Sequence, residues 1–218
     1  MISTQAQAVI ILATWSVLLA MYAVHRFASR IRFLKAPIVV NLNGVSASRP
    51  GSLLSGSGVL FVFVTNIATV GLVLASALSS SVESRLAFLQ LKLPLWVQIA
   101  GSLLFVLYSL WGLAVLFYNP NYSPLYKHLQ GQYVIVTEGP YRLVRHPRYG
   151  AEALANLIFC LFTGYWLPLL GILGWAGIYA QARAEERFLL ILAPQAYGAY
   201  RRRTGIFFPR AHSPSGPG

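Results

Sequence analysis

The sequence predicts an all-α integral membrane protein, a bundle of about five transmembrane helices. Of its 218 residues 56% are hydrophobic and only 10% are charged, whereas soluble domains carry about 25% charged residues. The mean hydropathy is +0.61. A net charge of +12 suggests a nucleic-acid partner, but membrane proteins concentrate Lys and Arg in cytoplasmic loops. We therefore expect the lipid bilayer, and no nucleic acid, as a partner.

Residues 1–118 are predicted to form a three-helix transmembrane region. Its apolar segments cover about residues 6–25, 58–79 and 93–117, each long enough to cross a bilayer. The segments 36–57 and 80–92 between them read as loops. Within the second span Asn66 and Thr69 are polar, which predicts interhelical packing or hydrogen bonding.

Residues 119–210 form the second region: a polar loop, an apolar stretch and a basic tail. Residues 150–180 are apolar except for Glu152. As a single helix they would span about 46 Å, against a hydrocarbon core of about 30 Å. The turn and aromatic residues at 163–168 permit either one long kinked span or a hairpin of two helices. Residues 211–218 are predicted to be a disordered tail.

The distribution of Lys and Arg favours the hairpin. Five of the seventeen lie in residues 26–49, four in 119–149 and six in 183–210, but two in 80–92. Only a hairpin brings the three rich segments to one membrane face, as the positive-inside bias requires. The prediction is about five spans, with the N-terminus outside and the C-terminus in the cytoplasm.

The basic and aromatic stretch 139–149 lies where the polar loop meets the apolar hairpin. Pro147 suits a first helical turn with His146 as N-cap. One helix face then carries Arg145, Tyr149, Glu152 and Asn156. Glu152 is either a functional carboxylate beside the bundle or an interfacial partner of Arg148 or Arg145, whereas Asn156 is read as a packing residue.

A second polar cluster, Glu185 and Glu186 among arginines, ends the following helix. Alone it would be a solvated helix end, but the hairpin returns it to the same membrane face as His146 and Tyr149. Other chemistries are absent from the sequence: the isolated histidines give no metal-ligand spacing, and without Asp there is no Ser-His-Asp triad. No Gly-rich nucleotide loop is present either. A cofactor site must then be built from helix ends and loops.

These motifs, in this order, resemble the isoprenylcysteine carboxyl methyltransferase family and the wider group of membrane methyltransferases that includes phospholipid N-methyltransferases. The resemblance covers about residues 115–210. It is carried by Gly139-Pro140-Tyr141, Arg145-His146-Pro147-x-Tyr149, Glu185-Glu186, Ala196-Tyr197-x-x-Tyr200-Arg201-Arg202-Arg203 and Phe208-Pro209.

The resemblance implies S-adenosyl-L-methionine as methyl donor, with 119–210 as the catalytic region and its loop at the cytoplasmic cofactor site. The implied cofactor-binding residues are His146, Tyr149, Glu185, Glu186, Tyr133, Val134, Val136, Gly139 and Tyr141. Arg145, Arg183 and Glu152 would position a lipophilic or lipidated acceptor: a prenylcysteine carboxylate, a phospholipid amine or a thiol. The family often has histidine where Tyr133 stands, and prenylcysteine enzymes carry an arginine near Gln181.

Two alternatives stay open at this point. Membrane sterol and steroid reductases, which use NADPH, have similar C-terminal halves, although they usually have more spans. The chain is otherwise a non-catalytic membrane protein of the same fold. We expect a multi-pass protein of a bacterial inner membrane rather than of the endoplasmic reticulum.

Overall fold

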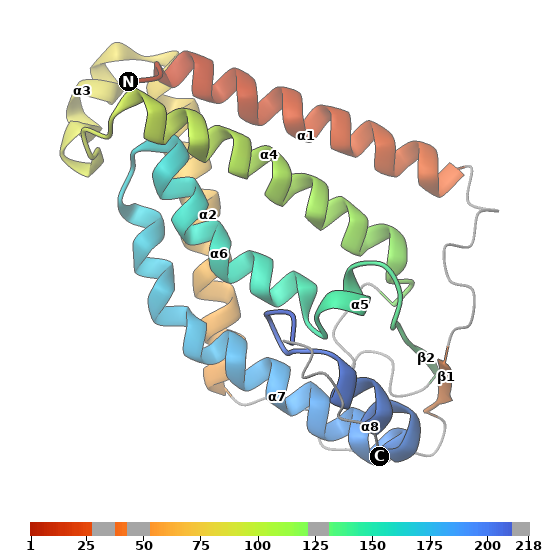
Figure 1. Ribbon diagram of the computed structural model, residues 1–218. Coiled ribbons are helices and arrows are strands. Elements are labelled where there is room, and N and C mark those ends of the chain that lie inside the picture. Colours follow the sequence, from red (N-terminus) through yellow and green to blue (C-terminus); the bar gives the residue numbers. More distant parts are fainter. Residues whose placement is uncertain (28–37, 43–52, 122–130, 211–218) are drawn as a thin grey trace, which may run out of the picture.

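The computed structural model describes residues 1–27, 38–42, 53–121 and 131–210, which are mostly helical (Figure 1). In this part of the chain three helices are long and apolar enough to cross a membrane: α1 (Thr4–Phe27), α2 (Leu53–Leu78) and α4 (Leu95–Tyr118). They correspond to the three spans predicted in the first region. The predicted disordered tail at 211–218 lies outside the described residues.

Two segments predicted as loops contain regular structure. Residues 80–92 include helix α3 (Ser80–Leu86) and the 3-10 turn η1 (Ala87–Leu89). Ser79 caps α3, since its hydroxyl oxygen accepts a hydrogen bond from the Val82 N–H. Helix α2 begins five residues earlier than predicted, because Ser57 and its glycine neighbours continue the helix and the Ser57 hydroxyl donates to the Leu53 carbonyl.

The all-α prediction also misses a small antiparallel sheet. Strand β1 (Ile38–Asn41), inside the predicted loop 36–57, pairs with β2 (Gln132–Ile135), with Ile38 opposite Ile135. Their β-branched residues suit a strand, but each strand has only four residues and its partner is far away in sequence. A separate hydrophobic cluster joins this sheet to the last helices through Leu42, Ile135, Phe188, Leu189 and Tyr197.

The described ends of the long helices collect into two opposite groups. At one end the backbone N–H of Ile2 donates to Gln98, and Thr4 donates to Glu83 in α3. At the other end lie β1, β2, α5 (Pro140–Leu143) and α8 (Pro194–Arg203) (Figure 1). The described parts of the three basic segments therefore share one end of the molecule, away from α3.

After α6 (Pro147–Thr163) the chain reverses direction (Figure 1). Gly164 ends α6 in the left-handed region, with φ of +78°, which glycine adopts without steric cost. The chain continues through η3 (Leu167–Gly174), a 3-10 segment packed on α6 and α2, into α7 (Trp175–Leu192). This path brings the second half of α7 to the start of α6.

A polar contact inside the helical bundle holds this reversed segment. The Asn156 side-chain amide of α6 donates to the Asn66 Oδ1 of α2 at 3.0 Å, and the Trp175 indole N–H donates to the Asn156 Oδ1 at 3.2 Å. The predicted interhelical hydrogen bond of Asn66 and the packing role of Asn156 are confirmed. Thr69 instead donates to the Thr65 carbonyl of its own helix.

Helix α2 and the η3–α7 segment approach closely through glycines. A Cβ atom on Gly58 would lie 2.7 Å from the Gly177 Cα and 2.8 Å from the Gly174 carbonyl oxygen. Both are backbone atoms, so no side-chain rotation can remove the clash. Small residues at such crossings are how apolar helices gain packing energy in a membrane.

We predict that Gly58→Ala destabilises the protein by about 1–3 kcal/mol, the usual cost of overpacking. The matched control is Gly71→Ala in the same helix, where a Cβ meets nothing within 4 Å. That control gains about 0.5–1 kcal/mol from helix propensity. Thermal unfolding of the purified proteins in one detergent measures both; equal melting temperatures for the two variants would refute the close crossing.

Candidate functional site

The segment that follows α8 is hydrogen-bonded to the residues that precede α6. The backbone N–H groups of Arg145 and His146 donate to the carbonyls of Gly205 and Ile206 at 2.9 and 3.0 Å. Gly139, with φ of +59°, lies against the Tyr118 ring, where a Cβ would come within 2.6 Å of ring atoms. Gly139 therefore has a structural reason to be glycine.

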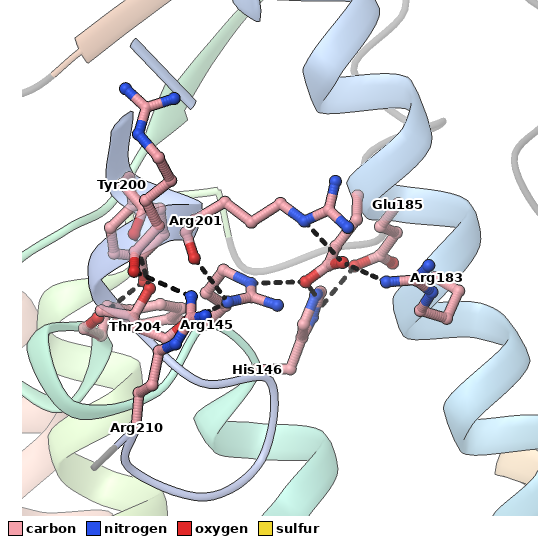
Figure 2. Close-up of polar contacts among 11 residues, drawn as sticks. Arg145, His146, Arg183, Glu185, Tyr200, Arg201, Thr204 and Arg210 are labelled. Atoms are coloured by element: carbon pink, nitrogen blue, oxygen red, sulfur yellow. Dashed lines mark hydrogen bonds and ion pairs between the residues drawn. The ribbon is translucent and has the colours of Figure 1, made fainter. Parts of the chain in front are cut away.

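The buried carboxylate of Glu186 forms ion pairs with Arg145, Arg183 and Arg201, the three arginines at the centre of the cluster in Figure 2. The side chain is 2% exposed, and its Oε1 lies 2.5 Å from Arg145 Nε. Oε2 lies 3.2 Å from an Arg183 guanidinium nitrogen and 3.9 Å from Arg201 Nε. Arg145 also donates to the carbonyls of Arg201 and Thr204. This cluster ties α7 and α8 to the start of α6.

The charge of Glu186 is held by these neighbours. Burial opposes ionisation, but the neighbouring His146 and Arg145 side chains outweigh it and lower the pKa to about 2, from an ordinary value of 4.5. A carboxylate that accepts charged hydrogen bonds keeps its partners in fixed positions. Glu186 therefore orients Arg145 and His146 across the physiological pH range.

Glu185 lies beside this cluster, in contact with the face of α6. Its Oε1 accepts from the Tyr149 hydroxyl at 2.8 Å and from the Gln181 amide at 3.0 Å. Its Oε2 is 3.9 Å from His146 Nδ1, and the His146 ring stacks on Tyr149 with centroids 5.6 Å apart. His146 is 8% exposed, and its Nε2 lies 3.7 Å from Glu186 Oε1, just beyond hydrogen-bond distance.

These side chains line a cavity of about 510 Å³, here called the large cavity. Strand β2 and the residue after it form one wall, α6 a second and α7–α8 a third. Of the residues predicted for the site, nine line it: Tyr133, Val134, Val136, Tyr141, Arg145, His146, Tyr149, Glu152 and Glu185. Burial raises the pKa of Tyr133, so its phenol is neutral.

Three predicted site residues are placed outside the described lining of the large cavity. Gly139 packs on Tyr118, whereas Arg183 and Glu186 belong to the ionic cluster behind the cavity wall. Arg145 reaches the cavity, but its guanidinium is bonded to Glu186 and two carbonyls. The segments predicted to meet do lie together. The sequence did not distinguish the residues that face the cavity from those that support its wall.

Several wall residues were missed, among them the polar residues Asn121 and Tyr200. Asn121 accepts from the Val134 N–H at 2.9 Å and donates to the Val134 carbonyl at 2.7 Å, and thus binds the free edge of β2. The Tyr200 hydroxyl donates to the Tyr141 carbonyl at 2.6 Å. The motif Ala196-Tyr197-x-x-Tyr200 could have indicated Tyr200 as a site residue. Nothing in the sequence indicated Asn121 except its position in a polar loop.

A second cavity, of about 370 Å³, lies between α1, α2, α4 and α6 and is here called the interhelical cavity. It shares four lining residues with the large cavity: Phe63, Val115, Arg148 and Glu152. The Tyr108 hydroxyl donates to Glu152 Oε2 at 3.4 Å. Glu152 therefore stands where the cavity at the helix ends, which holds the His146 and Glu185 side chains, adjoins the cavity inside the bundle.

The depressed pKa of Glu186 predicts a pH-dependent stability. The unfolded chain binds the proton near pH 4.5 and the folded chain only near pH 2. The stabilisation, on the order of 3 kcal/mol, is complete above pH 4.5 and lost as pH falls towards 2. Glu186→Gln removes it, so the difference in unfolding free energy between native protein and variant should shrink between pH 5 and 2.

Chemical unfolding at a series of pH values measures this difference. Glu83→Gln, which changes a carboxylate at the opposite end of the molecule, serves as the matched control and keeps the native profile. A gap between native protein and Glu186→Gln that stays constant with pH would contradict the assignment.

No protein-family model matches the chain. A curated relative, the cobalt-zinc-cadmium resistance protein CzcN of Cupriavidus metallidurans, is 40% identical to it over 82 residues. The match covers 35% of this chain and 36% of that protein, so the chain spans about a third of the length of the relative. The similarity is partial and does not show a family.

Proposed function

We propose that the protein is an integral membrane methyltransferase that uses S-adenosyl-L-methionine and acts on a lipophilic acceptor. One observation carries the proposal: the motif residues His146, Tyr149 and Glu185 line the large cavity, and that cavity adjoins the interhelical one at Glu152. A water-soluble donor and a membrane-soluble acceptor need two such compartments that meet. The resemblance of residues 115–210 to membrane methyltransferases supports the same reading.

We propose further that α6 and the η3–α7 segment cross the membrane as a hairpin, which gives five spans. The described parts of the basic segments gather at one end of the molecule, and this arrangement supports a cytoplasmic location for that end by the positive-inside bias. The large cavity would then open to the cytoplasm, with the N-terminus on the opposite side.

The large cavity fits the proposed donor in size and in chemistry. Small-molecule sites measure about 300–1,000 Å³, and this one has about 510 Å³. The His146 ring and the Glu185 carboxylate, both in the cavity lining, offer a polar ring and an anion to a ligand that carries hydroxyl, amino and carboxylate groups and a positive sulfonium. Aromatic side chains at 133, 141 and 149 supply flat apolar surface for a nucleobase.

When bound, the donor would supply an electrophilic methyl group. The protein must then hold the acceptor atom about 3–3.5 Å from that carbon and in line with it. Glu152, at the shared wall, is suited to position the acceptor or to take its proton. Arg145 and Arg183, which are bonded to Glu186, act as positioning residues for His146 and the cavity wall.

The partial relative suggests a second candidate, a role in metal tolerance. Its name says that it is a cobalt-zinc-cadmium resistance protein. Among the described residues no group of three or more His, Cys, Asp or Glu side chains could hold a metal ion, so the second candidate rests on the relative's name. Growth of a deletion strain on cobalt, zinc and cadmium salts, with and without the gene restored, tests this second candidate. Growth of the deletion strain equal to that of the parent strain would refute it.

We predict that isothermal calorimetry detects binding of S-adenosyl-L-methionine, and that NADPH titrated side by side gives no heat. His146→Ala and Glu185→Gln should each weaken donor binding at least about tenfold, since each removes a charged or buried hydrogen bond. Matched controls are His25→Ala and Glu83→Gln, neither of which lines the large cavity. Binding of NADPH alone would favour the reductase alternative, and undiminished donor binding in both site variants would remove the site assignment.

Glu152→Gln should separate binding from transfer. We predict that donor affinity changes little, while methyl transfer to a membrane extract falls about 10²-fold, the loss expected from a misplaced acceptor. Transfer is measured with a donor that carries a labelled methyl group, followed by mass spectrometry of the lipids. Equal loss of donor affinity and of transfer would place Glu152 in the donor site instead.

A further inference from the structure

The interhelical cavity is lined mostly by apolar side chains, but two of its polar residues each have one atom without a hydrogen-bond partner among the described residues. Asn66 on α2 is 5% exposed and Ser109 on α4 is 8% exposed. The Asn66 Nδ2 and the Ser109 Oγ are buried with no hydrogen-bond partner among the described residues. Both residues line the cavity. A buried polar group without a partner costs about 1–3 kcal/mol, so two beside one cavity require a reason.

The orientation of Asn66 follows from its neighbours. The Trp175 indole N–H can only donate, and it donates to the Asn156 Oδ1. Asn156 therefore presents its amino group to the Asn66 Oδ1. The Asn66 carbonyl oxygen is used in this contact, and the Asn66 amino group is the part left over. It needs an acceptor atom.

Ser109 differs from three other hydroxyl side chains on α2 and α4. Ser102, Thr65 and Thr69 each donate to a carbonyl three or four residues earlier in their own helix, the usual way for such residues to be satisfied in an apolar helix. The Ser109 hydroxyl makes no such bond. It is available both to donate and to accept.

We infer that the interhelical cavity binds a lipophilic molecule that carries a carbonyl or hydroxyl oxygen, held by Asn66 and Ser109 within the bundle. Asn156, the hydrogen-bond partner of Asn66, lies four residues beyond Glu152 on α6, a rise of about 6 Å. The oxygen of the ligand thus lies about one helical turn further into the bundle than the acceptor group that reacts beside Glu152. This inference rests on the proposed function for the role of the ligand as acceptor, and it narrows the acceptor to an oxygen-bearing lipophile.

The test uses two probes that differ only in this oxygen: a brominated long-chain ketone and the brominated alkane of the same length. Bromine quenches tryptophan fluorescence at short range, and Trp15 and Trp111 line the cavity. With the full-length protein in phosphatidylcholine vesicles, the ketone should half-saturate the quenching at a concentration about three- to tenfold lower than the alkane, the value of one or two neutral hydrogen bonds.

The decisive comparison is between the native protein and Ser109→Ala. Since the hydroxyl has no partner, its removal should leave the melting temperature unchanged or raise it, while the preference for the ketone falls. Ser102→Ala and Thr69→Val, which remove hydroxyls bonded within their own helices, keep the preference. Asn66→Leu should reduce it too, but also breaks the contact with Asn156, so it is read only alongside the melting curve.

The outcomes separate this inference from the proposed function. Neither measurement contains a methyl donor, so failure of S-adenosyl-L-methionine to bind would refute the methyltransferase and leave this test unaffected. Equal quenching by ketone and alkane in the native protein would overturn the inference and assign the cavity to plain acyl chains. A loss of preference in Ser102→Ala as large as that in Ser109→Ala would overturn it as well.

Discussion

The burial of the Glu186 carboxylate among Arg145, Arg183 and Arg201 is the interaction on which the proposed site depends. Removal of either partner from a buried ion pair is costly, because it leaves an uncompensated charge. The contacts of Glu186 come from the start of α6, from α7 itself and from α8. One side chain thus fixes where three helices of different sequence position meet. The large cavity lies between these helices, strand β2 and the start of α2.

A second constraint acts inside the bundle, where no water satisfies polar groups. Trp175, Asn156 and Asn66 form a chain of hydrogen bonds from the start of α7 through α6 to α2. The glycines at 58, 174 and 177 allow the same helices to approach closely. Together these contacts set the path of the chain after its reversal at Gly164, and with it the distance of Glu185 and Glu186 from His146.

The two cavities give a physical meaning to the shared wall at Glu152. The large cavity holds the Glu185 carboxylate, the His146 imidazole and several phenols among apolar side chains. The interhelical cavity shares Arg148 and Glu152 with it and is otherwise bordered mainly by apolar and aromatic side chains, with the unsatisfied Asn66 Nδ2 and Ser109 Oγ among them. A reaction between a charged donor and a lipophilic acceptor needs such a boundary, since neither partner is stable in the surroundings of the other.

The sequence by itself determined the membrane class, the three long apolar helices and the pairing of two polar clusters, because hydropathy and charge asymmetry are properties of composition. It also indicated His146, Tyr149 and Glu185. Only the tertiary structure decided that Glu186 and Arg183 stand behind the cavity wall, that β1 pairs with β2, and that Asn66 and Ser109 face a common cavity. Neighbouring carboxylates such as Glu185 and Glu186 look alike in a sequence, and only the direction of each side chain on α7 separates the residue that lines the cavity from the one that holds its wall.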